Sequence, residues 1–150
     1  MPRFTTTDGV SLYYSDEGDG LPLLCLSGLT RDGRDFDYLA PHLADVRLIR
    51  LDYRGRGQSE WAPYTTYTIP TEARDALELL RHLDLPNVAL LGTSRGGLIA
   101  MGLAAAQKDC LRGVALNDIG PDLAPEGLRV IEGYLGRVPA WASVEDAVAQ

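Results

Sequence analysis

The chain has 150 residues, of which 45% are hydrophobic and 23% charged, a composition typical of a globular protein with a core of its own. Its net charge of −7 argues against nucleic acid or an anionic membrane surface as the main partner. No apolar stretch approaches the ~20 residues of a membrane span, and no signal peptide is evident, so we expect a cytoplasmic protein.

The two cysteines, Cys25 and Cys110, each lie at or beside an apolar strand-like run. Neither has a partner at the spacing of a metal site, and two cysteines do not make a disulfide framework. We interpret both as buried free thiols, and we expect neither a metal nor a cofactor.

The N-terminal residues are typical of a β-hairpin. Two β-prone runs, residues 4–7 and 10–15, flank Asp8-Gly9, a dipeptide that favours a two-residue turn. Leu12 and Tyr14 alternate with polar neighbours, which predicts one half-buried face.

From residue 21 onward, strand-like and helix-like segments alternate. Strands are predicted at residues 21–26, 46–51, 88–91 and 111–116, and helices at residues 36–43 (with a break or restart at Pro41), 69–83 and 95–107. In the second helix, Thr68 is the expected N-cap, and Ala73, Leu77, Leu80 and Asp84 mark the expected stripe. This alternation predicts an α/β protein: an N-terminal hairpin followed by a mainly parallel sheet flanked by helices.

Residues 53–59 form a loop rich in glycine and arginine. Glycines and arginines are suited to binding an anion, so one interpretation of this loop is a phosphate-binding site. It lacks the lysine and the spacing of a P-loop, however, so we favour a structural loop.

The character of the chain changes after Pro121. Residues 125–137 predict an amphipathic helix, residues 138–141 a linker, and Ser143-x-x-Asp146 the capping box of another helix. The apolar face of the first of these helices consists of Leu128, Ile131, Tyr134 and Leu135. We therefore divide the chain into a sheet-containing part, residues 1–121, and the beginning of a helical part, residues 122–150.

Residues 92–96, Gly-Thr-Ser-Arg-Gly, join a predicted strand to a predicted helix. In that context the pattern G-x-S-x-G indicates a nucleophile elbow, in which a strained turn projects the serine hydroxyl above the sheet edge. The two glycines allow strand and helix to approach closely. Ser94 is thus the candidate nucleophile.

Five segments in order now carry a family resemblance. They are Asp8-Gly9, Ser27-Gly28, residues 52–59, residues 92–96 and residues 117–121. Together they resemble the N-terminal half of α/β-hydrolase-fold proteins, in the cap-bearing branch of esterases, carbon–carbon bond hydrolases, lactonases and non-haem perhydrolases. Epoxide hydrolases and haloalkane dehalogenases of this fold carry aspartate at the nucleophile position, so Ser94 argues against both.

The resemblance implies Ser94 as nucleophile and the backbone N–H groups of Leu29 and Arg95 as oxyanion hole; the Arg95 amide also opens a helix, where unpaired donors favour negative charge. Asp118, after a strand, is a minor candidate for the triad acid, which more often follows a later strand. Ser27 stands where the family commonly has a histidine. For the Arg95 side chain we favour an exposed helix start over a role in steering an acidic substrate.

A serine nucleophile needs a histidine base, which follows the acid in this fold. No histidine follows Ser94, and we interpret His42 and His82 as ordinary helix residues. The resemblance therefore implies a chain truncated before its C-terminal strands and inactive alone, with the missing half of the fold, in the same or another chain, as partner. Residues 122–150 would begin its cap.

Two functions remain open. The first is a serine hydrolase acting on a small ester, thioester, lactone or dicarbonyl substrate. The alternative is a non-catalytic binder or receptor that keeps the pocket of the fold without turnover.

Overall fold

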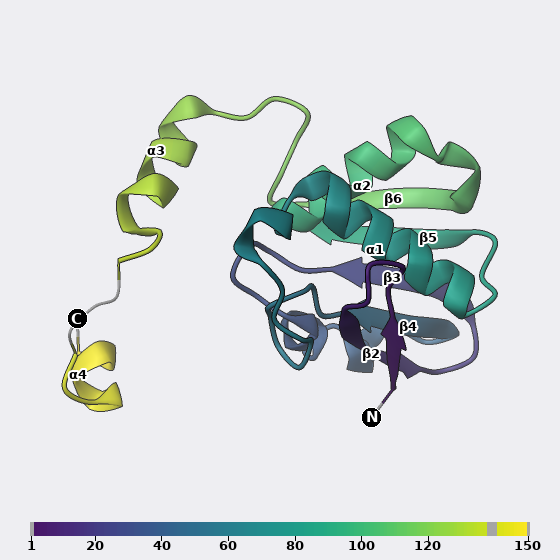
Figure 1. Cartoon of the computed structure of the whole chain (residues 1–150), viewed down its shortest axis with the longest axis horizontal. Helices are drawn as coiled ribbons and strands as arrows, with labels where there is room; N and C mark the ends of the chain where they lie inside the picture. The colour runs from purple at the N-terminus through teal and green to yellow at the C-terminus, as the bar shows by residue number, and fades with distance from the viewer. Residues whose placement is uncertain (1, 138–140, 150) are drawn as a thin grey trace.

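Strands and helices alternate along the chain as the sequence predicts, and the computed structural model describes them over residues 2–137 and 141–149. The six strands are β1 (Arg3–Thr5), β2 (Ser11–Glu17), β3 (Leu21–Leu26), β4 (Val46–Leu51), β5 (Val88–Thr93) and β6 (Leu111–Asn117). They form one sheet in the order β1-β2-β4-β3-β5-β6 (Figure 1). β4, β3, β5 and β6 pair in parallel, whereas β2 is antiparallel to both β1 and β4. The predicted hairpin ahead of a parallel sheet is confirmed.

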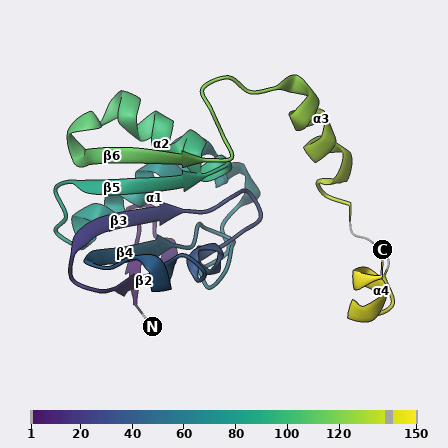
Figure 2. The ribbon, with the colours of Figure 1, turned by 180° about the vertical axis from the view of Figure 1, so that it is seen from behind.

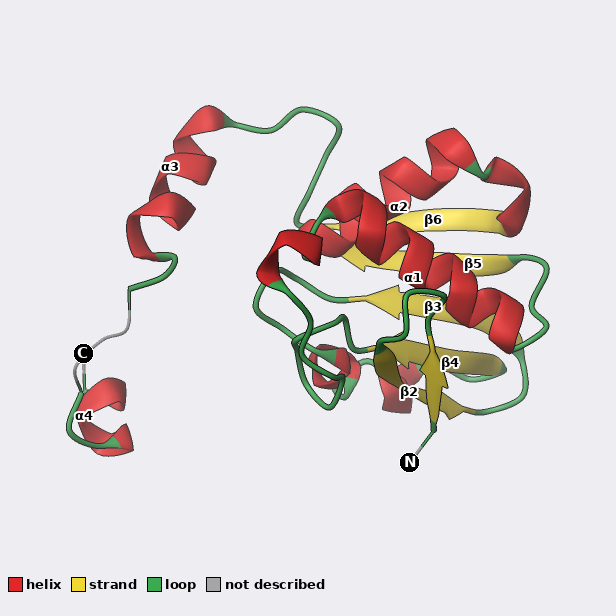
Figure 3. Ribbon diagram, viewed as in Figure 1, coloured by secondary structure: helices red, strands yellow, loops and turns green. Residues whose placement is uncertain are grey.

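The α-helices are α1 (Ile69–His82), α2 (Arg95–Ala106), α3 (Pro125–Tyr134) and α4 (Val144–Val148). Short 3₁₀ helices are η1 (Gly33–Phe36), η2 (Ala40–His42), η3 (Tyr64–Thr66) and η4 (Lys108–Cys110). α1 and α2 cover the same face of the sheet, in front of it in Figure 1 and behind it in Figure 2. α3 and α4 lie away from the sheet, at the end of a long connection from β6 (Figure 3).

Alternate residues of the central strands face two separate hydrophobic clusters. Leu24 and Leu26 of β3 pack in the larger cluster, which includes buried residues of α1 and α2. Cys25, between them, faces the opposite side and packs with Phe36 of η1 and Leu48 of β4. A strand buried on both faces explains why residues 21–26 read as a continuous apolar run.

Over residues 36–43, where a helix with a break or restart at Pro41 is predicted, the structure has the last residue of η1, a turn and then η2. Pro41 lies in the first turn of η2, which agrees with the predicted restart of the helix at this residue. Proline has no amide hydrogen to continue a helical ladder, which explains why one regular helix does not form here. At the start of η1, Asp32 accepts a hydrogen bond from the Arg34 amide at 3.0 Å.

The hairpin turn is longer than two residues, because β1 ends at Thr5 and β2 begins at Ser11. Thr6 closes the connection: its amide donates to the Val10 carbonyl at 2.9 Å, and its hydroxyl donates to Asp8 at 2.6 Å. Gly9 has φ of +87°, as its place in the turn predicts. Beyond the turn, Leu12 and Tyr14 face the core as expected.

Helix α1 begins as predicted, since the Thr68 hydroxyl accepts from the Thr71 amide at 3.3 Å. Its buried face differs from the predicted stripe: Ala73 and Leu77 are only partly buried, and Asp84 is exposed beyond the helix end. The buried positions are instead Glu72, Asp75, Ala76, Glu78, Leu79 and Leu80. Apolar periodicity missed this face because three of its side chains are carboxylates that become buried through ionic partners.

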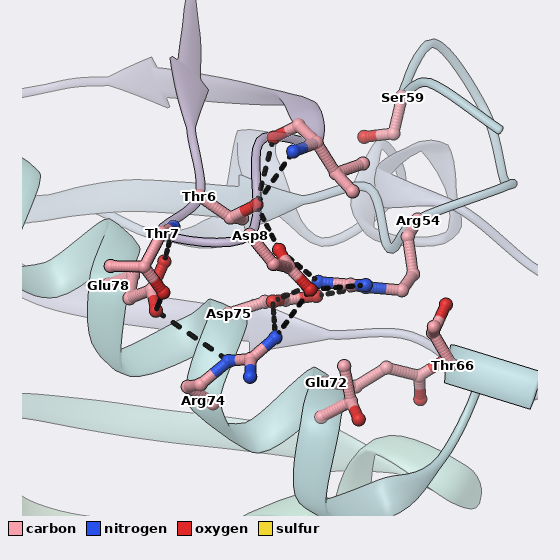
Figure 4. Close-up of polar contacts among 12 residues, drawn as sticks. Thr6, Thr7, Asp8, Arg54, Ser59, Thr66, Glu72, Arg74, Asp75 and Glu78 are labelled. Atoms are coloured by element: carbon pink, nitrogen blue, oxygen red, sulfur yellow. Dashed lines mark hydrogen bonds and ion pairs between the residues drawn. The ribbon is translucent and has the colours of Figure 1, made fainter. Parts of the chain in front are cut away.

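Arg54 supplies one of these partners and explains the loop over residues 53–59 (Figure 4). Its guanidinium is fully buried and donates to Asp75 of α1 at 2.6 and 2.7 Å, and to Asp8 of the hairpin turn at 3.1 and 3.2 Å. Arg74 donates to Asp8 from the other side at 2.7 Å. The arrangement ties three segments together and supports the structural interpretation of the loop.

The two thiols differ in accessibility, which gives a test of the fold. Cys25 is fully buried, and burial raises the pKa of its thiol to about 12, while Cys110 is partly exposed. Because the thiolate is the reactive form, we expect a disulfide reagent at about pH 8 to modify Cys110 alone in the native protein. Both thiols should react in denaturant. Fast native labelling that survives Cys110→Ser would contradict the placement of Cys25.

Candidate active site

Ser94 occupies the turn between β5 and α2, with φ of +50° and ψ of −113°. Positive φ is unfavourable for a residue with a Cβ atom, so the turn stores strain that its surroundings must hold. The Ser94 amide donates to the Asn117 carbonyl of β6 at 2.9 Å, and the Ser94 carbonyl accepts from the amides of Gly97 and Leu98. In the part of the chain that the structure describes, the Ser94 hydroxyl has no hydrogen-bond partner.

The glycines on either side of Ser94 lie where no side chain fits. A Cβ atom at Gly92 would lie 2.6 Å from the carbonyl oxygen of Gly96, and one at Gly96 would overlap the carbonyl oxygen of Leu26. The strand and helix therefore approach as closely as the sequence pattern predicts, and the beginning of α2 rests on the end of β3.

The segment after β3 lies against the serine. A Cβ atom at Gly28 would lie 3.9 Å from the Cβ atom of Ser94. Next to Gly28 is Leu29, and Arg95 follows Ser94 at the first position of α2. Among the described residues, no turn, loop or side-chain hydrogen bond uses the amide of Leu29 or that of Arg95. Both amides are thus available as donors beside the serine, one of them at a helix N-terminus.

Ser27, at the position where the resemblance leads one to expect histidine, is fully buried. Its hydroxyl is the buried side-chain atom without a hydrogen-bond partner among the described residues. Its carbonyl oxygen accepts from the Tyr53 hydroxyl at 3.2 Å. Burial raises the pKa of Tyr53, so this phenol stays protonated and can donate to the loop.

The side chain of Arg95 is not the exposed helix start that we favoured. Only 15% of it is exposed, its Nε donates to Glu72 at 2.8 Å and its Nη2 to the Tyr67 carbonyl at 3.0 Å. The alternative role, steering of an acidic substrate, is also disfavoured, because Nε and Nη2 of Arg95 already donate to Glu72 and Tyr67. The sequence contained no signal for the pairing, since Glu72 lies in a different element and far along the chain.

Neither histidine forms a hydrogen bond with Ser94 within the described residues. The His82 ring stacks on Phe4 at 5.7 Å and meets Tyr14 edge-on at 5.9 Å, and His42 is exposed in η2. This packing fits their interpretation as ordinary helix residues. Asp118 is exposed, with φ of +54°, and directly follows the Asn117 carbonyl that anchors Ser94.

A groove of about 1110 Å³ runs beside the elbow, on the sheet face opposite α1 and α2. Thr93 and Asn117 line it next to the turn, and Thr30 lines it from the loop after β3. Within the described ranges, no group of three or more histidine, cysteine, aspartate or glutamate residues is arranged to hold a metal ion. No described helix has the length and apolar character needed to cross a bilayer.

Beyond β6, the helical segments form largely as predicted. α3 ends at Tyr134, before Gly136 adopts φ of +74°. Leu128 and Tyr134 of this helix, and Leu135 directly after it, are exposed. Ser143 caps α4 by accepting from the Asp146 amide at 3.1 Å. Of the predicted linker, residues 138–140 lie outside the described residues.

A family model for the alpha/beta hydrolase fold matches residues 22–148. The chain belongs to the α/β-hydrolase fold family. It is 41% identical over 138 residues to a 3-hydroxybutyrate-oligomer hydrolase of Cupriavidus necator, covering 91% of this chain and 47% of the relative. It is 36% identical over 110 residues to lipase LipV of Mycobacterium tuberculosis, covering 73% of this chain and 41% of the relative.

Among solved structures, an α/β hydrolase from Novosphingobium aromaticivorans matches with a TM-score of 0.85 and 42% identity, over 91% of this chain and 50% of that one. These matches confirm the family resemblance and the predicted fold class. The chain spans about half the length of the curated relatives it matches, and those relatives include hydrolases and lipases.

Proposed function

We propose that the whole protein containing this α/β-hydrolase chain is a serine hydrolase with Ser94 as its nucleophile. The observation that carries the proposal is the strained turn: Ser94 sits at φ of +50° between β5 and α2, with a free hydroxyl. A strained serine at this strand–helix junction is the signature of a nucleophile elbow. The hydrolase relatives support the same reaction class.

The proposed substrate is a small ester, thioester, lactone or dicarbonyl compound. Ser94 Oγ attacks the carbonyl carbon and gives its proton to a histidine base, and the carbonyl oxygen becomes an oxyanion. The amides of Leu29 and Arg95 donate to that oxyanion. The oxyanion then collapses to an acyl-enzyme as the bond to the leaving group breaks, and the leaving group takes the proton from the base. Water attacks the acyl-enzyme in the same way, which releases the acid and restores the Ser94 hydroxyl. Among these substrates we favour esters. One relative is a 3-hydroxybutyrate-oligomer hydrolase, and ester bonds join the units of such oligomers.

The base and the principal acid are proposed to come from outside residues 1–150. His82 is engaged with Phe4 and Tyr14, and His42 is exposed in η2, so neither is placed as a partner of Ser94. Asp118 is kept as the secondary candidate for the acid. The remainder of the fold, in the same or another chain, is therefore the proposed partner, and residues 122–150 are proposed to begin a lid over the substrate pocket at Ser94.

A fluorophosphonate probe tests the proposal on the whole protein. The probe forms a covalent bond with an activated serine, so we expect one adduct per protein, located on Ser94 by peptide mapping and absent from Ser94→Ala. Residues 1–150 alone should show no turnover of an ester substrate, because the base is missing. If the whole protein binds acyl ligands yet remains unlabelled, the non-catalytic binder replaces this proposal.

A further inference from the structure

Glu72 of α1 is a fully buried carboxylate shared by two arginines. Its Oε1 accepts from Arg56 Nη1 at 3.0 Å, and its Oε2 accepts from Arg95 Nε at 2.8 Å. Each arginine side chain is only 15% exposed. A buried carboxylate needs such partners, but two of them from separate segments are more than charge balance alone requires.

Both arginines also connect Glu72 to the backbone near Ser94. Arg95 is itself the residue whose amide follows the serine, so its side chain anchors the first turn of α2 to α1. Arg56 Nε donates to the carbonyl oxygen of Leu29 at 2.7 Å, which fixes the loop after β3. One carboxylate thus connects the two residues whose amides lie beside Ser94.

The rings around Arg56 restrict it further. Its guanidinium carbon lies 5.7 Å from the centre of the Tyr53 ring and 5.4 Å from that of Tyr67. Arg95 donates to the carbonyl oxygen of the same Tyr67. The guanidinium planes are therefore held by several contacts, and little freedom remains in the connection from Glu72 to either loop.

We propose that Glu72 is a positioning residue, acting through Arg56 and Arg95 to hold the amides of Leu29 and Arg95 at one oxyanion position. The inference rests on the proposed function, since it assigns a role in the same reaction. The two amides come from segments far apart in the sequence, the loop after β3 and the beginning of α2. Donors must lie within about 0.5 Å of the productive geometry to stabilise a transition state. Glu72 fixes the positions of both amides relative to each other, because it binds both arginines.

The test compares Glu72→Gln with Glu78→Gln in the whole protein. Both residues lie on α1, are buried and accept hydrogen bonds. The partners of Glu78 are Thr7 of the hairpin turn and Arg74 (Figure 4), neither of which contributes to the oxyanion position. A purely structural role predicts similar consequences for both changes. Positioning of the oxyanion donors predicts that Glu72→Gln alone changes the chemical step.

With p-nitrophenyl butyrate as substrate, we expect Glu72→Gln to lower kcat about 10–100-fold with KM nearly unchanged, because the lost stabilisation belongs to the transition state. Affinity for an aryl trifluoromethyl ketone, which forms a tetrahedral adduct, should fall by a similar factor. The pH profile of kcat/KM should keep its midpoints, since Glu72 transfers no proton. Glu78→Gln should keep kcat within about two-fold of the parent.

Arg56→Gln covers the case in which Glu72→Gln does not fold, because it leaves the pair between Glu72 and Arg95 intact. It removes the hydrogen bond to the Leu29 carbonyl, and we expect the same loss of kcat and of inhibitor affinity. Folded Glu72→Gln or Arg56→Gln protein with parental kcat would overturn the proposal. Activity that persists in Ser94→Ala would instead refute the proposed function, so the two failures are distinguishable.

Discussion

Replacing Ser94 with alanine is expected to lower kcat for ester hydrolysis by the whole protein about 10⁴–10⁶-fold, the loss typical of removing a serine nucleophile. The reason is geometric as well as chemical: the hydroxyl sits in the turn between β5 and α2 with no competing hydrogen-bond partner in the described structure. Alanine keeps the Cβ atom and the backbone anchors, so the fold should not change. Steady-state hydrolysis of p-nitrophenyl butyrate measures the effect.

Ser15→Ala serves as the matched control for this experiment. Ser15 lies on β2, where its hydroxyl accepts from Arg50 at 2.7 Å, and it has no proposed part in the reaction. We expect this variant to keep kcat within about two-fold of the parent. Comparable activity in Ser94→Ala and Ser15→Ala would refute the assignment of the nucleophile.

Replacing Arg54 with methionine is expected to reduce the free energy of unfolding at neutral pH by about 3–5 kcal/mol, because a buried carboxylate then loses its partner. Arg54 is fully buried and Asp75 is 1% exposed, so water cannot compensate for the loss. Urea unfolding followed by circular dichroism measures the change. Arg34→Met is the control: 83% of the Arg34 side chain is exposed in its pair with Asp32, and it should cost less than about 1 kcal/mol.

The stability difference between the parent and Arg54→Met should shrink as the pH falls from neutral toward about 4. In the parent, hydrogen bonds from Arg54 hold the pKa of Asp8 well below its usual value, so this contribution to stability persists down to about pH 4 and is lost only at lower pH. Without Arg54, burial raises the pKa of Asp75 further, so the variant gains stability as that carboxyl becomes protonated. A gap that widens on acidification would contradict the assigned ionic contacts.

Local patterns predicted the frame of the protein well. Alternation of apolar runs and helix formers placed the strands from β3 to β6 and the helices α1 and α2, because each of these segments carries its own periodicity. Thr68 was found as a cap and Ser94 as an elbow serine for the same reason. Both features depend on residues within one turn of each other.

Local sequence patterns did not predict contacts between segments that are far apart in the chain. The predicted stripe of α1 omits Glu72, because a charged residue is normally exposed. In the structure Glu72 is buried, since Arg56 and Arg95 both pair with it. Arg95 was expected to be exposed for the same reason. Over residues 36–43 the interruption at Pro41 was predictable, because proline lacks the amide hydrogen that a continuous helix needs, but the 3₁₀ form of both short helices was not.

The amino-acid sequence by itself determined the order of strands and helices, the family of the fold and the serine at the elbow, since these follow from local conformational preferences. Only the tertiary structure decided which charges are buried and what each one holds. Burial of a charge depends on whether partners from remote segments replace its water, and Glu72 meets both of its arginines only after α1, the loop after β4 and α2 have packed together.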